Sequence, residues 1–439
     1  MSQRGIDATE PVVVSNIRRT ENSAGLTLSA DLRLPDCASR RELWFRLPSD
    51  LAPSVAAQGD PFLPVALVLA RYLRRSLVVE SDVSTMLLAG ARRIMEIQAD
   101  WAGGALPPIV IEATPAPRER RGTAAGLFFS GGVDSFYTLL RNVSRYPRTD
   151  ARAISHLLLI HGYDITLEQT ELFANLRKRA VVVADALDRR LVPVVTNAGD
   201  LQREVLKGLD FGDHCAGPLL ASVGLALGEL CHTLFISASN AHAYRTIRAW
   251  SSHPALDPLW STEQTEFVHS GAEATKVEKT RLVASNDMAL RMLRVCFENL
   301  GPFESRYNCG RCRKCLRTML LLKVYGVLDK AELFPATLTP ERVERLDIIG
   351  QEDKWGETLE EVRCLGTEPD LTAAMRTALT RSAWAKSRLG QADARVSRSL
   401  ARIGLDPRVL RKLDRGMLGG LGMPLLRAGM RRAARGAKP

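Results

Sequence analysis

The feature that most constrains this chain is an alternation of short apolar runs with longer amphipathic segments between residues 124 and 238. The runs are almost uninterrupted, as in strands that are buried on both faces. They cover 126–129, 154–160, 191–196 and 232–238, and helical apolar spacing marks 133–143, 167–187 and 216–231. This order predicts an α/β fold, in which helices cover both faces of a parallel sheet. A ligand of such a sheet lies beyond the carboxyl ends of the strands.

Residues 1–120 predict a smaller α+β domain of unknown role ahead of this sheet. Strand patterns occupy 11–17, 26–34 and 42–48, and helical patterns occupy 62–73 and 83–101. The Pro- and Arg-rich stretch 113–123 is typical of a linker. We therefore predict three parts: the α+β domain at 1–120, the α/β domain at 121–330, and a helical, basic C-terminal region at 331–439.

The positive charge of the chain is concentrated at its end. The net charge is +11, and the segment from Leu371 onward holds 16 Lys and Arg against three Asp. Such a tail is typical of an anionic partner, such as RNA or an acidic protein, or of a solvated helical surface. No apolar run approaches the roughly 20 residues of a membrane span, and no secretory pattern opens the chain. We expect a soluble, cytoplasmic protein, with a homodimer as one candidate assembly.

The loop after the first strand of the alternating region carries the clearest chemistry. Its residues are Ser130, Gly131, Gly132, Val133, Asp134 and Ser135. The two glycines lack a Cβ, so the backbone can turn tightly and present N–H groups to an anion at the start of a helix. The two serines add hydroxyl donors. The aspartate fits a phosphate site if a divalent cation bridges it to the phosphates, or if it holds the loop by hydrogen bonds.

This loop resembles the pyrophosphate loop of the N-type ATP pyrophosphatases. The chain contains neither G-x-x-x-x-G-K-[ST] nor a proper G-x-G-x-x-G, the usual NTPase and dinucleotide motifs. Members of that superfamily cleave ATP between the α and β phosphates and activate a carboxylate or carbonyl oxygen as an adenylate. The resemblance implies that residues 130–135 hold the leaving pyrophosphate, with ATP and Mg²⁺ as cofactors.

Four of the eight cysteines form a second motif. They are Cys296, Cys309, Cys312 and Cys315, with spacings of twelve, two and two residues. Cys-x2-Cys steps bring thiolates together from a tight turn, and four thiolates complete the tetrahedral shell of a structural Zn²⁺ ion. A four-cysteine iron–sulfur cluster also fits the number of ligands.

Together the two motifs resemble 7-cyano-7-deazaguanine synthase, a branch of the same superfamily with an SGGxDS loop and one Cys before C-G-x-C-x-x-C. The resemblance covers about residues 124–325 and is patchy between the motifs. Members convert a 7-carboxy-deazaguanine to an amide and then a nitrile, using ammonia and ATP. This chain is longer at both ends, which leaves the acceptor open. Long relatives occur in anti-phage defence operons, so a partner protein is a second candidate acceptor.

Further site residues follow from this resemblance and from their position. The lysine-bearing helix of the family corresponds to Lys276 and Lys279, which would act with Asp134 on the charge of the leaving pyrophosphate. His161 and Asp164 follow the second strand of the sheet and are expected on the nucleotide side. Five residues beyond the fourth strand are candidates for the substrate pocket or for an ordinary surface loop. These are Ser239, Asn240, His242, Tyr244 and Arg245.

Three functions remain open from the sequence. The first is an ATP-dependent adenylating enzyme of the ligase type, which prepares its acceptor for attack by nitrogen. The second is a nucleotide-sensing protein that associates with RNA or membranes, which the basic tail favours. The third is a tRNA thiolation-type enzyme, which requires catalytic cysteines outside the metal set. Cys215 and Cys231 lie on or at the end of an apolar helix, where buried core cysteines are the better interpretation.

Overall fold

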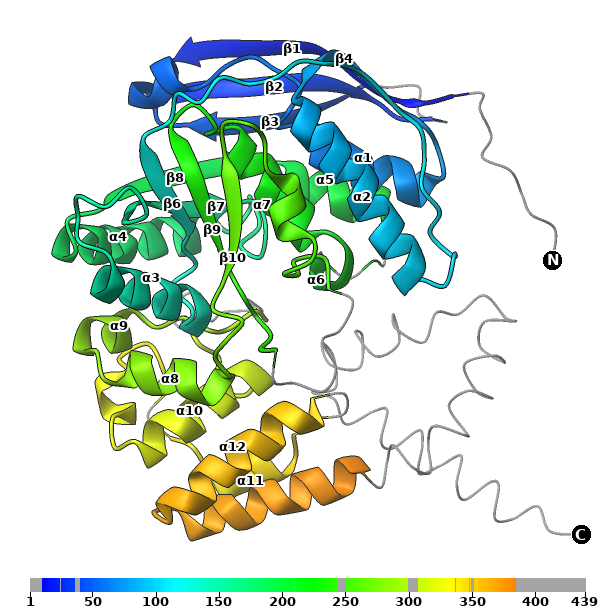
Figure 1. Cartoon of the computed structure of the whole chain (residues 1–439). Helices are drawn as coiled ribbons and strands as arrows, with labels where there is room; N and C mark the ends of the chain where they lie inside the picture. The colour runs from blue at the N-terminus through cyan, green and yellow to red at the C-terminus, as the bar shows by residue number, and fades with distance from the viewer. Residues whose placement is uncertain are drawn as a thin grey trace, which may run out of the picture.

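The computed structural model describes residues 10–23, 25–35, 40–207, 209, 211–242, 250–298, 307–335, 337–346, 348 and 351–383. These residues form one mixed sheet of ten strands in the order β10-β9-β6-β7-β8-β3-β2-β1-β4-β5, and most of the helices pack around it (Figure 1). The predicted candidates Tyr244 and Arg245 and the basic tail beyond 383 lie outside the described residues.

The strands are β1 Val12–Asn22, β2 Gly25–Arg33, β3 Arg41–Leu47, β4 Leu77–Val83, β5 Ile111–Pro115, β6 Ala124–Phe128, β7 Ile154–His161, β8 Arg190–Thr196, β9 Cys231–Ser237 and β10 Glu266–Ser270. The helices are α1 Leu63–Leu73, α2 Thr85–Trp101, α3 Val133–Arg145, α4 Thr170–Ala186, α5 Ala198–Val205, α6 Phe211–His214, α7 Ala216–Leu225, α8 Lys276–Ala284, α9 Asp287–Met292, α10 Arg313–Val324, α11 Pro340–Glu344 and α12 Glu352–Leu365. Short 3₁₀ helices are η1 Ser49–Ser54, η2 Asp257–Trp260 and η4 Leu328–Lys330, and residues 369–383 are also helical.

Strands β10, β9, β6, β7 and β8 are parallel neighbours, which confirms the α/β fold. Their residues alternate between two cores. In β6, Ala124 and Phe128 belong to the core that contains α7, whereas Ala125 and Leu127 belong to the core beneath α3 and α4. Because both faces of the sheet are covered, both sets of side chains are apolar. That explains the uninterrupted apolar runs of the sequence.

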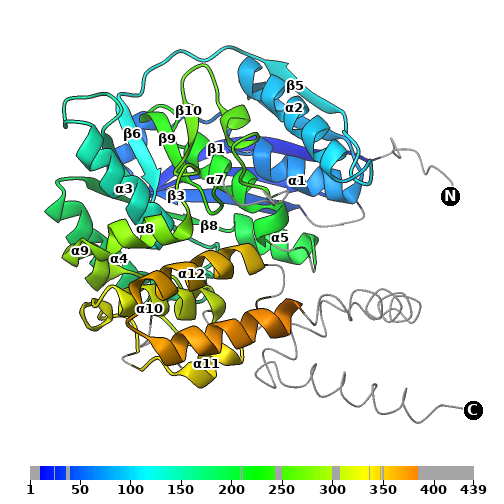
Figure 2. The ribbon, with the colours of Figure 1, turned by 60° about the horizontal axis from the view of Figure 1, so that its bottom comes forward.

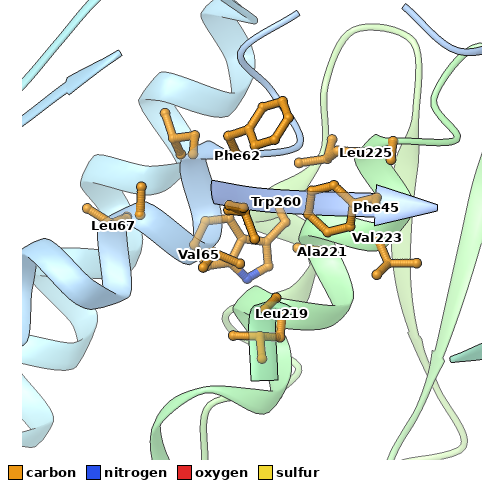
Figure 3. Packing of buried hydrophobic residues seen from close by; sticks show 14 of the residues in the cluster. Phe45, Phe62, Val65, Leu67, Leu219, Ala221, Val223, Leu225 and Trp260 are labelled. Atoms are coloured by element: carbon orange, nitrogen blue, oxygen red, sulfur yellow. The ribbon is translucent and has the colours of Figure 1, made fainter. Parts of the chain in front are cut away.

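The N-terminal strands extend the same sheet. Strands β1, β2 and β3 form antiparallel pairs, and β3 joins β8 through Phe45–Thr196 and Arg46–Val195. The two halves also share a core: Val65 and Leu67 of α1 lie beside Trp260 and the apolar face of α7 (Figure 3). Strand β5 includes residues 113–115, so the linker predicted at 113–123 is wrong there. The domain boundary near residue 120 stays a prediction.

The C-terminal helices form a third core beside the sheet. Helices α10, α11 and α12 and residues 369–383 surround Trp355, which is 1% exposed. Helix α12 packs against α8 and α10 (Figure 2). This arrangement places α8, α10 and α12 on the side of the molecule where β9 and β10 end. Among the described residues, no helix has the length and apolar character needed to cross a membrane.

Candidate functional site

The loop of residues 130–135 lies at the carboxyl end of β6 and leads directly into α3. Gly131 has a φ of +71°, a conformation that favours glycine. The Ser135 hydroxyl donates to the Gly132 carbonyl at 3.1 Å, and the two serine oxygens lie 3.4 Å apart. Gly132 caps α3 without a side-chain acceptor for the first N–H groups of the helix. The loop therefore has the backbone geometry of an anion site.

Two lysines of α8 meet the aspartate of this loop. Lys276 forms an ion pair with Asp134, and Lys279 lies 3.3 Å from the same carboxylate oxygen. Lys279 also donates to the Ala238 carbonyl at 2.6 Å, and its side chain is only 2% exposed. A capping box at Thr275 begins α8, so both lysines project from its first turn. The structure thus brings together the three residues predicted to be catalytic.

Burial and charge act in opposite directions on this cluster. Burial alone would raise the pKa of Asp134, but the ammonium groups of Lys276 and Lys279 outweigh it and hold the pKa well below its usual range. Burial lowers the pKa of Lys276 to about 7, although Asp134 opposes this shift. The aspartate is therefore an anion, and it holds the two lysines by direct contact.

Three further cations lie near this cluster, and the sequence interpretation did not place them beside the loop. Lys314 and Arg317 lie on α10, and Lys354 lies on α12. Lys314 is close enough to help lower the pKa of Asp134. Burial, followed by the charge of Arg317, lowers the pKa of Lys354 to about 8, and Asp134 opposes that shift. Several basic side chains therefore gather around Asp134, as expected of a site for a polyanion.

A buried arginine connects the loop to the second strand. The Arg294 backbone N–H donates to the Gly131 carbonyl at 2.9 Å, and its guanidinium lies 3.1 Å from Asp164. His161 is 5% exposed, donates from Nε2 to the Thr166 carbonyl at 2.8 Å, and stacks on Phe173. Asp164 is thus joined to the loop, whereas His161 shapes the turn after β7. Nucleotide contact by either residue stays a prediction.

The residues beyond β9 occupy the other side of the loop. Asn240 accepts a hydrogen bond from Lys354 at 2.6 Å, and the His242 backbone N–H donates to the Ala272 carbonyl at 2.8 Å. Ser239 is exposed. Asn240 therefore borders the cation cluster, which the sequence alone did not indicate.

The four predicted metal ligands converge. Their sulfur atoms all lie within 4.8 Å of one another, and those of Cys309 and Cys315 are 3.8 Å apart. A tetrahedral zinc with Zn–S bonds of about 2.3 Å has sulfurs about 3.8 Å apart, so the spacing fits a single ion. An iron–sulfur cluster would hold the thiolates further apart. Gly310, with a φ of +65°, makes the turn between the first two cysteines of the knuckle.

Backbone N–H groups donate hydrogen bonds to two of the cysteine sulfurs. The Cys312 N–H donates to the Cys309 sulfur at 3.3 Å, and the Cys315 N–H donates to the Cys312 sulfur at 3.4 Å. The other three thiols, led by Cys309, lower the pKa of Cys296, whereas hydrogen bonding led by Cys296 raises the pKa of Cys315. All four groups can ionise together only when a cation balances their charge.

Asn308 is a second residue that the sequence interpretation missed. It is fully buried, and its Oδ1 accepts from the backbone N–H groups of Val295 and Cys296 at 2.8 and 3.2 Å. Its Nδ2 donates to the Leu293 and Leu333 carbonyls at 2.9 and 3.2 Å. Asn308 therefore fixes the segment of Cys296 beside the Cys309–Cys315 knuckle. An Asn directly before Cys309 is too common a residue to be recognised from sequence.

Among the described residues, these cysteines are the only group of three or more His, Cys, Asp or Glu side chains close enough to share an ion. A Mg²⁺ ion at the loop would therefore depend on phosphate oxygens, with Asp134 as the nearest protein carboxylate. Cys215 and Cys231 are buried, and burial raises the pKa of Cys231 to about 12. They fit the core role predicted for them.

No family model, no curated protein and no solved structure matches this chain. The α/β fold and the four-cysteine cluster are shown by the structure, and no family is identified.

Proposed function

We propose that this protein binds Mg–ATP at residues 130–135, cleaves it to AMP and pyrophosphate, and activates a carboxyl or carbonyl group of an acceptor as an adenylate. The observation that carries this proposal is the group of basic side chains beside a glycine loop at the carboxyl end of β6. Such a loop binds phosphate through backbone N–H groups, and the surrounding lysines can balance charge on a leaving pyrophosphate.

Each group has a distinct task in this scheme. The N–H groups of the α3 first turn and the two serine hydroxyls hold the β and γ phosphates. Lys279 is buried and fixed by the Ala238 carbonyl, so it offers a positioned charge near Asp134. Lys276, which Asp134 holds in place, adds a second charge. Preorganised charges of this kind stabilise a transition state without reorganising when the reaction occurs.

The cysteine cluster acts on the same site through α10. We propose a structural Zn²⁺ ion at Cys296, Cys309, Cys312 and Cys315, because the sulfur spacing fits a single ion. Cys312 caps α10, and Lys314 and Arg317 lie on its first turns. An ion that fixes the start of α10 therefore also fixes two of the cations near Asp134.

The acceptor is a 7-carboxy-deazaguanine, by resemblance, or a group on a partner protein, with nitrogen as the attacking atom. A thiolation enzyme is less well supported, because Cys215 and Cys231 are buried and burial raises the pKa of Cys231 to about 12. A nucleotide sensor is the second candidate function. It rests on the basic tail, which lies outside the described residues.

The test measures the products of ATP with Mg²⁺, 7-carboxy-7-deazaguanine and ammonium. We expect AMP and pyrophosphate from the wild type, and at least a 100-fold loss in Asp134→Ala, which frees the two lysines. Asp150→Ala is the matched control, because Asp150 pairs with Arg152 on the surface far from the loop. It should retain full activity.

Other products would separate the candidates. AMP that forms without the deazaguanine would keep adenylation and point to another acceptor. ADP and phosphate would contradict cleavage between the α and β phosphates. ATP binding without turnover, even with cell extract as a source of acceptors, would favour the sensor.

A further inference from the structure

A small cavity lies next to Asn240, beyond the ends of β9 and β10. Its wall includes Asn240, His242, Ser252, His253 and His269. It offers about 10 Å³ to the centre of a water-sized molecule, which is room for one such molecule. The cavity is too small for a nucleotide or a nucleobase. The polar side chains in its wall suit a single small guest with N–H or O–H groups.

His269, the fourth residue of β10, is held by a buried carboxylate. Its Nδ1 lies 2.6 Å from Oδ2 of Asp257, and neither side chain is more than 5% exposed. A carboxylate accepts hydrogen bonds, so Nδ1 must carry the proton of this bond. In the neutral ring, Nε2 is then left with its lone pair, which is the state of a base.

Asp257 is itself fixed by two further donors. The Ser252 hydroxyl donates to Oδ2 at 2.8 Å, and the His253 backbone N–H donates to Oδ1 at 3.3 Å. The Ala255 N–H donates to Nδ1 of His253 at 3.0 Å, so the proton of a neutral His253 must be on Nε2. Burial lowers the pKa of His253, which keeps it neutral. The wall thus combines one ring acceptor with one ring donor.

The cavity is connected to the phosphate site by single residues. Asn240 lines the cavity and bonds Lys354 of the cation cluster. Two residues earlier, the Ala238 carbonyl accepts from Lys279, which contacts Asp134. The Ala238 N–H donates to Ser270, the residue after His269. A guest in the cavity would therefore lie next to Asn240, which bonds Lys354 of the cation cluster.

We propose that this cavity holds the small protic nucleophile, ammonia or water, and that His269 is its general base, positioned by Asp257. This inference rests on the proposed adenylation. The lone pair of the nucleophile forms a bond to the activated carbon, and its proton moves to Nε2 of His269. The carbon–oxygen bond to AMP breaks, and AMP leaves with that electron pair. No further reactant is needed.

The first test is NMR of protein labelled with ¹⁵N-histidine, which requires no acceptor. The imidazole signals that disappear in the spectrum of His269→Gln are assigned to His269. The proposal requires that the His269 ring carry its proton on Nδ1 and leave Nε2 unprotonated at pH 7.5. Ammonium chloride should shift its Nε2 resonance, whereas potassium chloride at equal concentration should not. His156, at the opposite end of the parallel strands, serves as the internal control.

The outcomes separate the two nucleophiles. An ammonium-specific shift supports ammonia, and the same tautomer without a shift supports water. A proton on Nε2, or a doubly protonated ring at this pH, overturns the assignment of His269 as the base. In Asp257→Asn the tautomer should change, because an amide can donate to Nδ1. An unchanged tautomer would overturn the positioning role of Asp257.

The second test separates the two half-reactions. Pyrophosphate exchange into ATP reports adenylation, and acceptor-dependent AMP release reports attack by the nucleophile. His269→Gln should retain exchange within about twofold and lose AMP release at least 100-fold, the usual size of general-base catalysis. Equal loss of both would contradict a role in the second step. Absence of exchange in the wild type would instead contradict the proposed adenylation.

Discussion

Two aspartates of this chain, the buried Asp60 and the part-buried Asp134, have opposite surroundings. Asp60, in the N-terminal half, is 1% exposed at its side chain and pairs with Arg118 at 2.8 Å. The Ser84 N–H donates to it at 2.7 Å. Burial raises the pKa of Asp60 against the effect of this single arginine. Asp134 instead contacts two lysines, with Lys314 and Lys354 nearby, and its pKa is lowered.

The difference separates a structural ion pair from a binding site. A buried pair is tolerated when one charge balances the other and hydrogen bonds satisfy the remaining atoms. The Asp60–Arg118 pair meets this condition within the described residues. Around Asp134, by contrast, burial and the charges of neighbouring basic side chains lower the pKa values of Lys276 and Lys354. Such a cluster stores repulsion that a polyphosphate would relieve.

The four cysteines extend the comparison to a site of negative charge, since four thiolates need a cation to balance them. We expect Cys315→Ser to lower bound zinc from one equivalent to less than about 0.2, and to lower the stability of the fold by several kcal/mol. Metal analysis and urea unfolding measure both effects. Cys364→Ser is the matched control, since Cys364 is exposed. Equal zinc content in the two variants would contradict the assigned ligands.

The two aspartate sites should respond differently when a cation is removed. Arg118→Met should lower the free energy of unfolding by about 3–5 kcal/mol, because it leaves Asp60 as an unpaired buried charge. Lys279→Met should cost less stability, since Lys276 still holds Asp134, but should reduce AMP formation by about 100-fold or more. Urea unfolding measures the stability of both variants, and product assays measure their AMP formation. Similar stability losses in both variants would contradict the distinction between the Asp60–Arg118 ion pair and the Asp134 site.

A polyanion should stabilise only the cluster around Asp134. At 100 times its Kd, pyrophosphate should add about 2.7 kcal/mol to the free energy of unfolding. Lys279→Met should lose most of this gain. Arg118→Lys, which keeps the positive charge beside Asp60, should retain the stabilisation by pyrophosphate. Thermal unfolding at increasing pyrophosphate concentrations is the measurement, and an equal gain in both variants would contradict the location of the site.

The smallest expected effect is a dependence of ATP affinity on pH. Burial lowers the pKa of Lys276 to about 7 and that of Lys354 to about 8, so both lose protons as the pH rises from 7 to 9. Bound phosphates would raise both pKa values, so binding should take up protons and weaken by up to about tenfold over this range. Calorimetry in buffers of different ionisation enthalpy measures the uptake. Proton release would contradict it.

The sequence predicted the parts of the fold whose signals are local. The strands of the parallel half are uninterrupted apolar runs, and the loop and the Cys-x2-Cys steps are contiguous motifs. Strand β10 spans only Glu266–Ser270, and β4 carries Glu80, Ser81 and Asp82 within Leu77–Val83, so neither gave a clear pattern. The attachment of β3 to β8 depends on pairing across about 150 residues, which periodicity does not encode.

The site was predictable only in part, for the same reason. Lys276 and Lys279 were found because they follow the last strand of the resembling segment. Lys354 reaches Asn240 from 114 residues away, and Arg294 joins Gly131 to Asp164 through tertiary contacts. No spacing in the sequence marks these side chains. The His269–Asp257 pair, twelve residues apart, was likewise hidden between a short 3₁₀ helix and a short strand.

The most direct test of the account is calorimetric binding of ATP, AMP and pyrophosphate to the wild type and to Lys279→Met. If the basic side chains around Asp134 form a polyphosphate site, the wild type should bind Mg–ATP and pyrophosphate at one site per chain, at least 100-fold more tightly than AMP. Lys279→Met should lose most of that preference. Equal affinity for ATP and AMP, or an unchanged preference in the variant, would contradict the central claim.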